Sequence, residues 1–178
     1  MRAARRIAVA CVVGLILLAK PLATGADPVP AQAPHIPVVQ RQAICEVSRG
    51  AGLGGIDLVA SLAVRTFPRR YWVTMTAIGY AESCGIPDRI GEIDTPYPSV
   101  GLWQIRLVHA RYLARVTGST DRTAWIRWLS IPGNNAQAAL AVYEGPGGLQ
   151  EWGAYRSGRW KLFVRAAERA IKEVEATK

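Results

Sequence analysis

Apolar residues recur every three or four positions along much of the chain, a spacing that places them on one face of an α-helix. This periodicity predicts a first helix from Val38 to Val47, before a glycine-rich stretch. It predicts further helices over residues 56–67, 72–82, 106–116, 123–129, 134–143 and 160–176. Strand signals are sparse. We therefore expect an all-α (mainly α) fold that forms a single globular domain, with at most a small hairpin.

Helix-breaking and capping residues set the expected boundaries. Pro68 ends the second predicted helix, and Gly85, with Pro87 beyond it, ends the third. Asn134 or Asn135 is the expected N-cap of the helix that follows, because a short polar side chain can accept from the free N–H groups of a first turn. Two long loops, rich in glycine, proline and aromatic residues, are expected over 86–103 and 144–158.

The first 26 residues have the layout of a secretory signal peptide. Three arginines precede a mostly apolar run over 7–19, and small residues follow near Ala26. The run is shorter than the roughly 20 residues that span a bilayer. An uncleaved N-terminal anchor, the one expected route to a membrane, is the alternative. Residues 27–37 contain four prolines and are predicted to be a linker, so the folded domain is expected over 38–178, in the cell envelope or secreted.

Composition and charge narrow the classes of function. With 178 residues, 50% of them hydrophobic and 20% charged, the chain can bury a core and is not expected to be disordered. Loss of residues 1–26 would lower Lys+Arg from 22 to 18 against 13 acidic residues, so the net charge would fall from +9 to +5. That modest positive charge suits an anionic envelope polymer. No nucleic-acid motif is present, and His35 and His109 lie too far apart to suggest a metal site; no cofactor is expected.

Two cysteines remain once a signal peptide containing Cys11 is removed. These are Cys45 and Cys84, and in an exported protein they are expected to form one disulfide. Two buried free thiols are the alternative.

Glu82 is the first candidate for chemistry. Its spacing from Met75, Ile78 and Gly79 puts it on the apolar side of its helix, in the last turn before Gly85. Desolvation and the helix dipole both disfavour an anion there, so the pKa of Glu82 is expected to be raised. A protonated carboxyl is what general-acid catalysis requires. A structural glutamate, bonded to a backbone group or an arginine, is the competing interpretation.

Short motifs follow Glu82 in a recognisable order. They are Ala81-Glu82-Ser83, then Ser99-Val-Gly101-Leu-Trp103-Gln104-Ile105, then Asn134-Asn135, then Ala141-Val-Tyr143-Glu-Gly145, and last Trp152-Gly-Ala-Tyr155. Over most of residues 40–160 the chain resembles the lysozyme-like lytic transglycosylases, those with the soluble-lytic-transglycosylase catalytic domain. Cys84 and Glu144 depart from the pattern of that family.

The resemblance implies a fold, a substrate and a set of site residues. The fold would be lysozyme-like, and Glu82 would be the catalytic acid/base. Gln104 and Tyr143 would line the cleft beside Glu82, and Tyr143 would bond its carboxyl. The substrate would be peptidoglycan glycan strands, cut by a monomer at the MurNAc–GlcNAc β-1,4 bond. The residues expected to bind substrate are Ser99, Gly101, Trp103, Gln104, Tyr143, Trp152 and Tyr155. Trp103, Trp152 and Tyr155 could stack on sugar faces, although Trp103 could equally pack beneath the turn that contains it.

A second carboxylate would change the expected product. Enzymes of the resembled kind use a single Glu and the 6-hydroxyl of the sugar, which leaves 1,6-anhydro-MurNAc ends, whereas hydrolases usually employ two carboxylates. Asp88, Glu92 and Asp94 lie in the loop after Glu82, and Asp94 is the expected choice if the chain is a muramidase-type hydrolase. These residues could equally be surface charges.

Two other classes of protein compete with a glycan-cleaving enzyme. One is a non-catalytic peptidoglycan-binding module of the same fold, which would not need Glu82. The other is a cysteine peptidase that uses Cys84 with His109. The peptidase is disfavoured because thiolates are activated at helix N-termini, and Cys84 lies at a predicted C-terminus.

Overall fold

A computed structural model describes Cys45 and residues 55–177 of the chain. The chain divides into two units, residues 1–35 and 36–178, and all described residues belong to the second. The predicted signal peptide, the linker and most of the predicted first helix lie outside the described residues. In the part that is described, none of the helices has the length and apolar character needed to cross a membrane.

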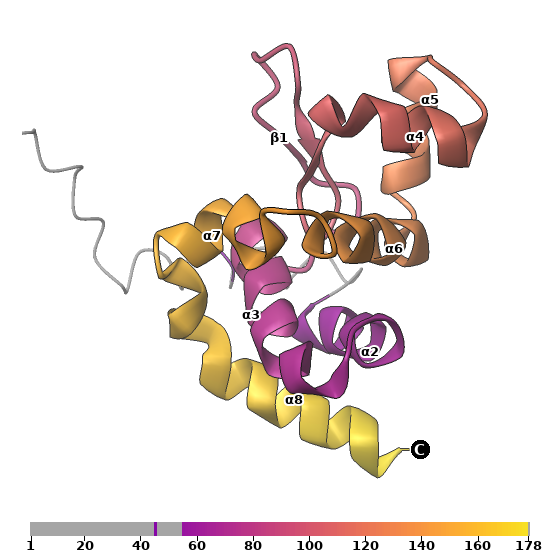
Figure 1. Cartoon of the computed structure of the whole chain (residues 1–178). Coiled ribbons are helices and arrows are strands. Elements are labelled where there is room, and N and C mark those ends of the chain that lie inside the picture. Colours follow the sequence, from indigo (N-terminus) through magenta and orange to yellow (C-terminus); the bar gives the residue numbers. More distant parts are fainter. Residues whose placement is uncertain (1–44, 46–54, 178) are drawn as a thin grey trace, which may run out of the picture. The chain divides into compact units, whose positions relative to one another are not determined.

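Helix α3 (Trp72–Ser83) is the centre of the fold. Its residues from Met75 to Tyr80 are all buried, because the helix is apolar on every side and is covered by its neighbours. Helices α2 (Ile56–Thr66) and α8 (Val164–Ala176) pack against it and against each other, as Figure 1 shows. Helix α6 (Pro132–Tyr143) packs on α2. The hydrophobic core lies around α3.

The segment between α3 and α6 contains a small sheet and two short helices. Strands β1 (Ile90–Gly91), β2 (Ser99–Val100) and β3 (Ile105–Arg106) form an antiparallel sheet in the order β1-β2-β3. The register pairs Ile90 with Val100 and Ser99 with Arg106. Helices α4 (Ala110–Thr117) and α5 (Arg122–Leu129) follow. The mainly α fold is thus confirmed, and the expected hairpin is a three-stranded sheet.

Several predicted boundaries were wrong. The turn η3 (Leu107–His109) precedes α4, and η5 (Arg159–Phe163) precedes α8, so both helices begin later than expected. The predicted loop over 144–158 contains η4 (Gly148–Glu151) and the short helix α7 (Gly153–Arg156). A further turn, η2 (Arg69–Tyr71), precedes α3.

Asn134 and Asn135 do not cap α6, contrary to the prediction. The helix begins at Pro132, whose fixed φ suits a first helical position, and Ile131 occupies the N-cap position without a side-chain bond. Asn135 is instead fully buried, and its amide joins the sheet to the helices.

The disulfide between Cys45 and Cys84 is confirmed, with Cα atoms 5.0 Å apart. Cys84 is the C-cap of α3 and adopts a left-handed backbone with φ of 56°. Helix α3 runs to Ser83, one residue beyond the predicted range of 72–82, and Cys84 rather than Gly85 is the first left-handed residue after it. The bridge holds the chain two residues after Glu82.

Candidate active site

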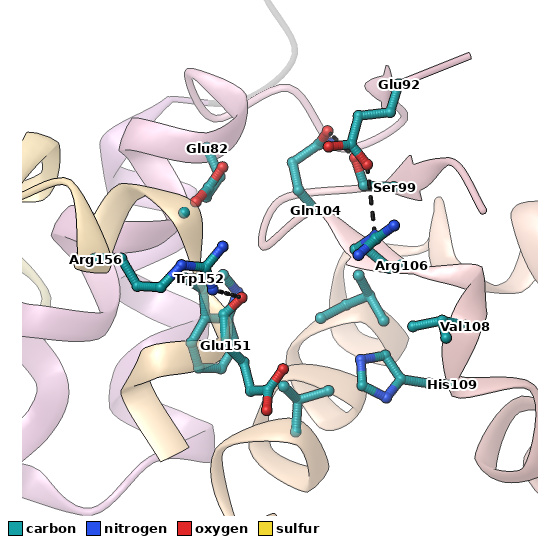
Figure 2. Close-up of a pocket in the computed structure, with 13 residues that line it drawn as sticks. Glu82, Glu92, Ser99, Gln104, Arg106, Val108, His109, Glu151, Trp152 and Arg156 are labelled. Carbon is teal, nitrogen blue, oxygen red and sulfur yellow. Dashed lines mark hydrogen bonds and ion pairs between the residues drawn. The ribbon is translucent and has the colours of Figure 1, made fainter. Parts of the chain in front are cut away.

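Glu82 lies at a pocket of about 220 Å³ between the end of α3 and the small sheet. Figure 2 shows Glu151, Trp152 and Arg156 on the side of Glu82, and the sheet with η3 on the other side. The lining residues from the sheet and η3 are Glu92, Ser99, Gln104, Ile105, Arg106, Val108 and His109. Val142 of α6 and Gly153 complete the lining.

The carboxylate of Glu82 is held by two donors. Its Oε1 accepts from the backbone N–H of Ala154 at 2.7 Å, and its Oε2 pairs with Nη2 of Arg159 at 3.2 Å. Ala154 is in the first turn of α7, where backbone N–H groups lack partners within the helix. A backbone group and an arginine are the partners that the competing interpretation of Glu82 named, whereas the apolar surroundings that were also expected are not found. The side chain is nevertheless only 13% exposed, so it is shielded from bulk water while it lines the pocket.

Gln104 is fixed at the pocket wall, in the turn between β2 and β3. Its Nε2 donates to the carbonyl oxygens of Arg89 at 3.0 Å and Gly101 at 2.8 Å, while its Oε1 accepts from Oγ of Ser99 at 2.8 Å. Gln104 also has a positive φ of 47°, a conformation that costs energy and is common at functional sites. Ser99 and Gln104, both expected from the sequence at the substrate site, thus line the pocket, and a hydrogen bond joins them.

Trp103 and Gly101 belong to the core and not to the pocket surface. The ring of Trp103 is fully buried, and its Nε1 donates to the carbonyl oxygen of Met75 at 3.0 Å. Because a buried ring offers no face to a sugar, the expectation that Trp103 stacks on the substrate was wrong. Gly101 is buried against Asn135, and its φ of 82° together with this close approach requires glycine. Trp152 lines the pocket but is 4% exposed, and its Nε1 donates to the carbonyl oxygen of Trp103.

Two predicted aromatic ligands are placed elsewhere. Tyr143 lies 4.9 Å from Tyr71, ring to ring, and the pKa of Tyr143 is raised, first by its hydrogen bond with Tyr71. Tyr155 stacks on Trp160 with ring centroids 5.6 Å apart. Neither Tyr143 nor Tyr155 is among the described residues that line the pocket. The contact between Tyr143 and Glu82 that the resemblance implied is replaced by contacts with Tyr71 and Phe67.

Of the three acidic residues in the loop after Glu82, it is Glu92 and not Asp94 that lines the pocket. Asp94 is exposed and lies outside the pocket lining, whereas Glu92 follows β1 directly and faces the pocket across from Glu82 (Figure 2). Its Oε2 is 3.5 Å from Nε of Arg106, and its backbone φ is 53°. The sequence named Glu92 among its candidates, but only the turn after β1 decides which carboxylate faces inward.

His109 and Glu151 are pocket residues that the sequence did not assign to the glycan site. Burial lowers the pKa of His109 and outweighs the opposing effect of nearby Glu151. Because His109 lies just before α4 and Glu151 in η4, no spacing in the sequence signals that they meet. Arg156 also lines the pocket, where its Nη1 donates to the backbone carbonyl oxygens of Gln150 and Glu151.

The peptidase alternative is contradicted by the disulfide. A nucleophilic cysteine must be a free thiolate, and the sulfur of Cys84 is bonded to that of Cys45. His109 therefore has no thiol partner in Cys84.

Comparison with known proteins adds one finding. A protein-family model described as a lysozyme-like domain matches residues 57–154, which is more than half of the chain. The matched segment runs from α2 to α7 and includes Glu82 and every other residue that lines the pocket except Arg156. The chain matches no curated protein and no solved structure.

Proposed function

The chain belongs to the family of lysozyme-like domains, a family active on peptidoglycan, and from that premise we propose that it is a lytic transglycosylase. It cleaves the β-1,4 bond between MurNAc and GlcNAc and leaves 1,6-anhydro-MurNAc ends. The observation that carries this proposal is the placement of Glu82, a shielded carboxylate on the wall of a sugar-sized pocket with one oxygen fixed by the Ala154 N–H.

Glu82 performs both proton transfers in this proposal. The cycle starts from the protonated side chain, with Oε2 released from Arg159, because an ionised carboxylate has no proton to give. That carboxyl donates its proton to the glycosidic oxygen while the bond from that oxygen to C1 breaks. The carboxylate then takes the proton of the sugar's 6-hydroxyl, whose oxygen forms a new bond to C1 and closes the anhydro ring. No water is consumed. Because Oε1 is held by Ala154, Oε2 is the oxygen that exchanges Arg159 for the glycosidic oxygen.

Gln104 supports this role by forming a rigid wall. Its amide is bonded to two backbone carbonyls and to Ser99, so it cannot swing into the space a sugar would fill. A site built on fixed groups loses little entropy when a ligand binds.

A muramidase-type hydrolase is the second candidate, and Glu92 favours it. A carboxylate opposite the general acid could activate water or stabilise the cationic centre. Glu92 faces the pocket but is half exposed and paired with Arg106, which favours a wall residue over a second catalytic group.

Glu82→Gln is expected to lower the rate of glycan cleavage at least about 100-fold, because an amide cannot donate and then recover a proton. The measurement is mass spectrometry of fragments released from purified peptidoglycan, and the wild-type fragments should be lighter by one water than hydrolysis products. Asp94→Asn is the matched control, since Asp94 is exposed and outside the pocket lining, and it should keep the wild-type rate.

The same fragments separate the competing functions. If the wild-type fragments have hydrated ends and Glu92→Gln loses activity, the protein is a muramidase-type hydrolase and not a transglycosylase. Binding to peptidoglycan without any release, unchanged in Glu82→Gln, would identify a glycan-binding module.

Export through residues 1–26 is part of the proposal. The disulfide supports it, because such bonds persist mainly in oxidising compartments outside the cytoplasm. The expected product is a mature chain that begins near Asp27, which N-terminal sequencing of the exported protein would identify.

A further inference from the structure

The Glu82 pocket continues into two neighbouring hollows. A second cavity of about 150 Å³ shares His109, Val142 and Glu151 with it. A third hollow of about 480 Å³, on the surface of α4, shares His109 and Tyr112 with the second. The three hollows therefore adjoin one another through His109, in a series from Glu82 to α4 that we call the groove.

The middle of the groove is largely apolar. Its wall includes Tyr112, Ala141 and Pro146, and the ring of Tyr112 is held edge-on against Trp128 with centroids 6.4 Å apart. Partial burial raises the pKa of Tyr112, so its hydroxyl remains a neutral donor. An aromatic ring with a polar tip suits a sugar, whose C–H face is apolar and whose edge carries hydroxyls.

The far end of the groove carries two arginines that are exposed. Arg111 and Arg115 line the third hollow, and the guanidinium carbon of Arg115 lies 5.6 Å from the centre of the Tyr112 ring. Neither has a carboxylate partner among the residues that the structure describes. The arginines nearer Glu82 all have partners: Arg106 pairs with Glu92, Arg159 pairs with Glu82, and Arg156 donates to the backbone carbonyl oxygens of Gln150 and Glu151.

The two ends of the groove differ in their carboxylates. Glu82, Glu92 and Glu151 line the Glu82 pocket, where Arg106 and Arg156 also lie. No Asp or Glu is among the described residues that line the α4 end, which has Arg111 and Arg115. The uncharged backbone of a glycan strand offers no carboxylate for Arg111 and Arg115 to bind. The peptides that branch from the strand do carry free carboxylates, and guanidinium groups are well suited to bind these.

We propose that Arg111 and Arg115 form a subsite for the carboxylates of the stem peptides, so that the substrate is peptide-bearing glycan. This subsite rests on the proposed function for its substrate. It binds a peptide branch while the glycan backbone passes over Tyr112 to Glu82. Arg111 and Arg115 determine specificity and touch no reacting atom.

The test compares glycan strands with native stem peptides and the same strands after their peptide carboxylates are converted to neutral amides. For the wild type, KM should be about fivefold lower on the native strands, from two exposed charge pairs. The double variant Arg111→Gln/Arg115→Gln should have the same KM on both strands, with kcat unchanged. Arg165→Gln, an exposed arginine of α8, is the charge-matched control and should keep the preference of the wild type.

A binding measurement separates this proposal from the catalytic one. In the Glu82→Gln background, sedimentation with insoluble peptidoglycan should still weaken when the carboxylates are amidated. This preference should disappear in the triple variant with Arg111→Gln and Arg115→Gln. Equal binding of native and amidated material would overturn the subsite and leave the assignment of Glu82 intact. If the wild type does not cleave the glycan but keeps the binding preference, the proposed enzymatic activity is overturned and the subsite stands.

Discussion

Asn135 joins three segments of the fold through one buried amide. Its Oδ1 accepts from the backbone N–H of Trp103 at 2.9 Å, and its Nδ2 donates to the carbonyl oxygens of Val100 and Leu129. These bonds connect α6 to the turn that holds Gln104 at the pocket. Asn is a strongly preferred N-cap residue, so its residue type alone led to the wrong prediction.

Asn135→Ala is expected to lower the free energy of unfolding by about 3 kcal/mol, because it leaves buried backbone groups unpaired and opens a cavity. Chemical denaturation monitored by tryptophan fluorescence measures this change. The neighbouring Asn134→Ala is the control: Asn134 is partly exposed and makes one bond, to the Trp128 carbonyl oxygen, so its loss should cost less than about 1 kcal/mol. Equal losses in the two variants would contradict the structural role of Asn135.

At the level of elements, the end of α3 determines where Glu82 points. Helix α3 ends at its C-cap Cys84, which has a left-handed backbone conformation, and the disulfide links Cys84 to Cys45. The first turn of α7 then supplies the N–H that holds the Glu82 carboxylate. The orientation of Glu82 therefore depends on both α3 and α7, which are far apart in the sequence.

Cys45→Ala is expected to destabilise the protein by about 4 kcal/mol, since the bridge closes a loop with a sequence separation of 39. Thermal unfolding by circular dichroism measures the change. Reduction of the wild type should give a similar shift, and a reductant should have no further effect on the variant. An unchanged melting temperature would mean that the bridge does not constrain the unfolded chain.

At the scale of the whole described domain, the groove is where the helices meet the sheet segment. Glu82 and Glu151 come from the helical side, and His109 comes from the turn that follows β3. His109 occupies the boundary between the Glu82 pocket and the rest of the groove. Its buried position favours the neutral imidazole, so folding opposes its protonation.

Stability should accordingly depend on pH through His109. The folded pKa lies below the ordinary value of 6.5, so the unfolded chain binds the proton more tightly. The contribution of His109 is complete above about pH 6.5 and is lost progressively as the pH falls toward the folded pKa. Urea denaturation at pH 7.5 and pH 5.5 should show a larger decrease for the wild type than for His109→Gln. An equal decrease would assign the effect to other groups.

The sequence by itself determined the helices, the disulfide and the acidic residue at the site. Apolar periodicity located α2, α3 and α5 to within about two residues, because helix formation depends on spacing within one segment. Removal of the predicted signal peptide would leave Cys45 and Cys84, so each had one possible partner. Glu82 could be singled out because its place on α3 is a local property of the helix.

Only the tertiary structure decided what surrounds Glu82. Ala154 and Arg159 reach it from more than 70 residues away, and Glu92 rather than Asp94 faces it because of the turn after β1. Trp103, for which the sequence left open stacking on a sugar or packing beneath its turn, is buried in the core, where its Nε1 donates to the carbonyl oxygen of Met75. Contacts between distant segments depend on how the elements pack, and no periodicity along a single segment encodes that packing.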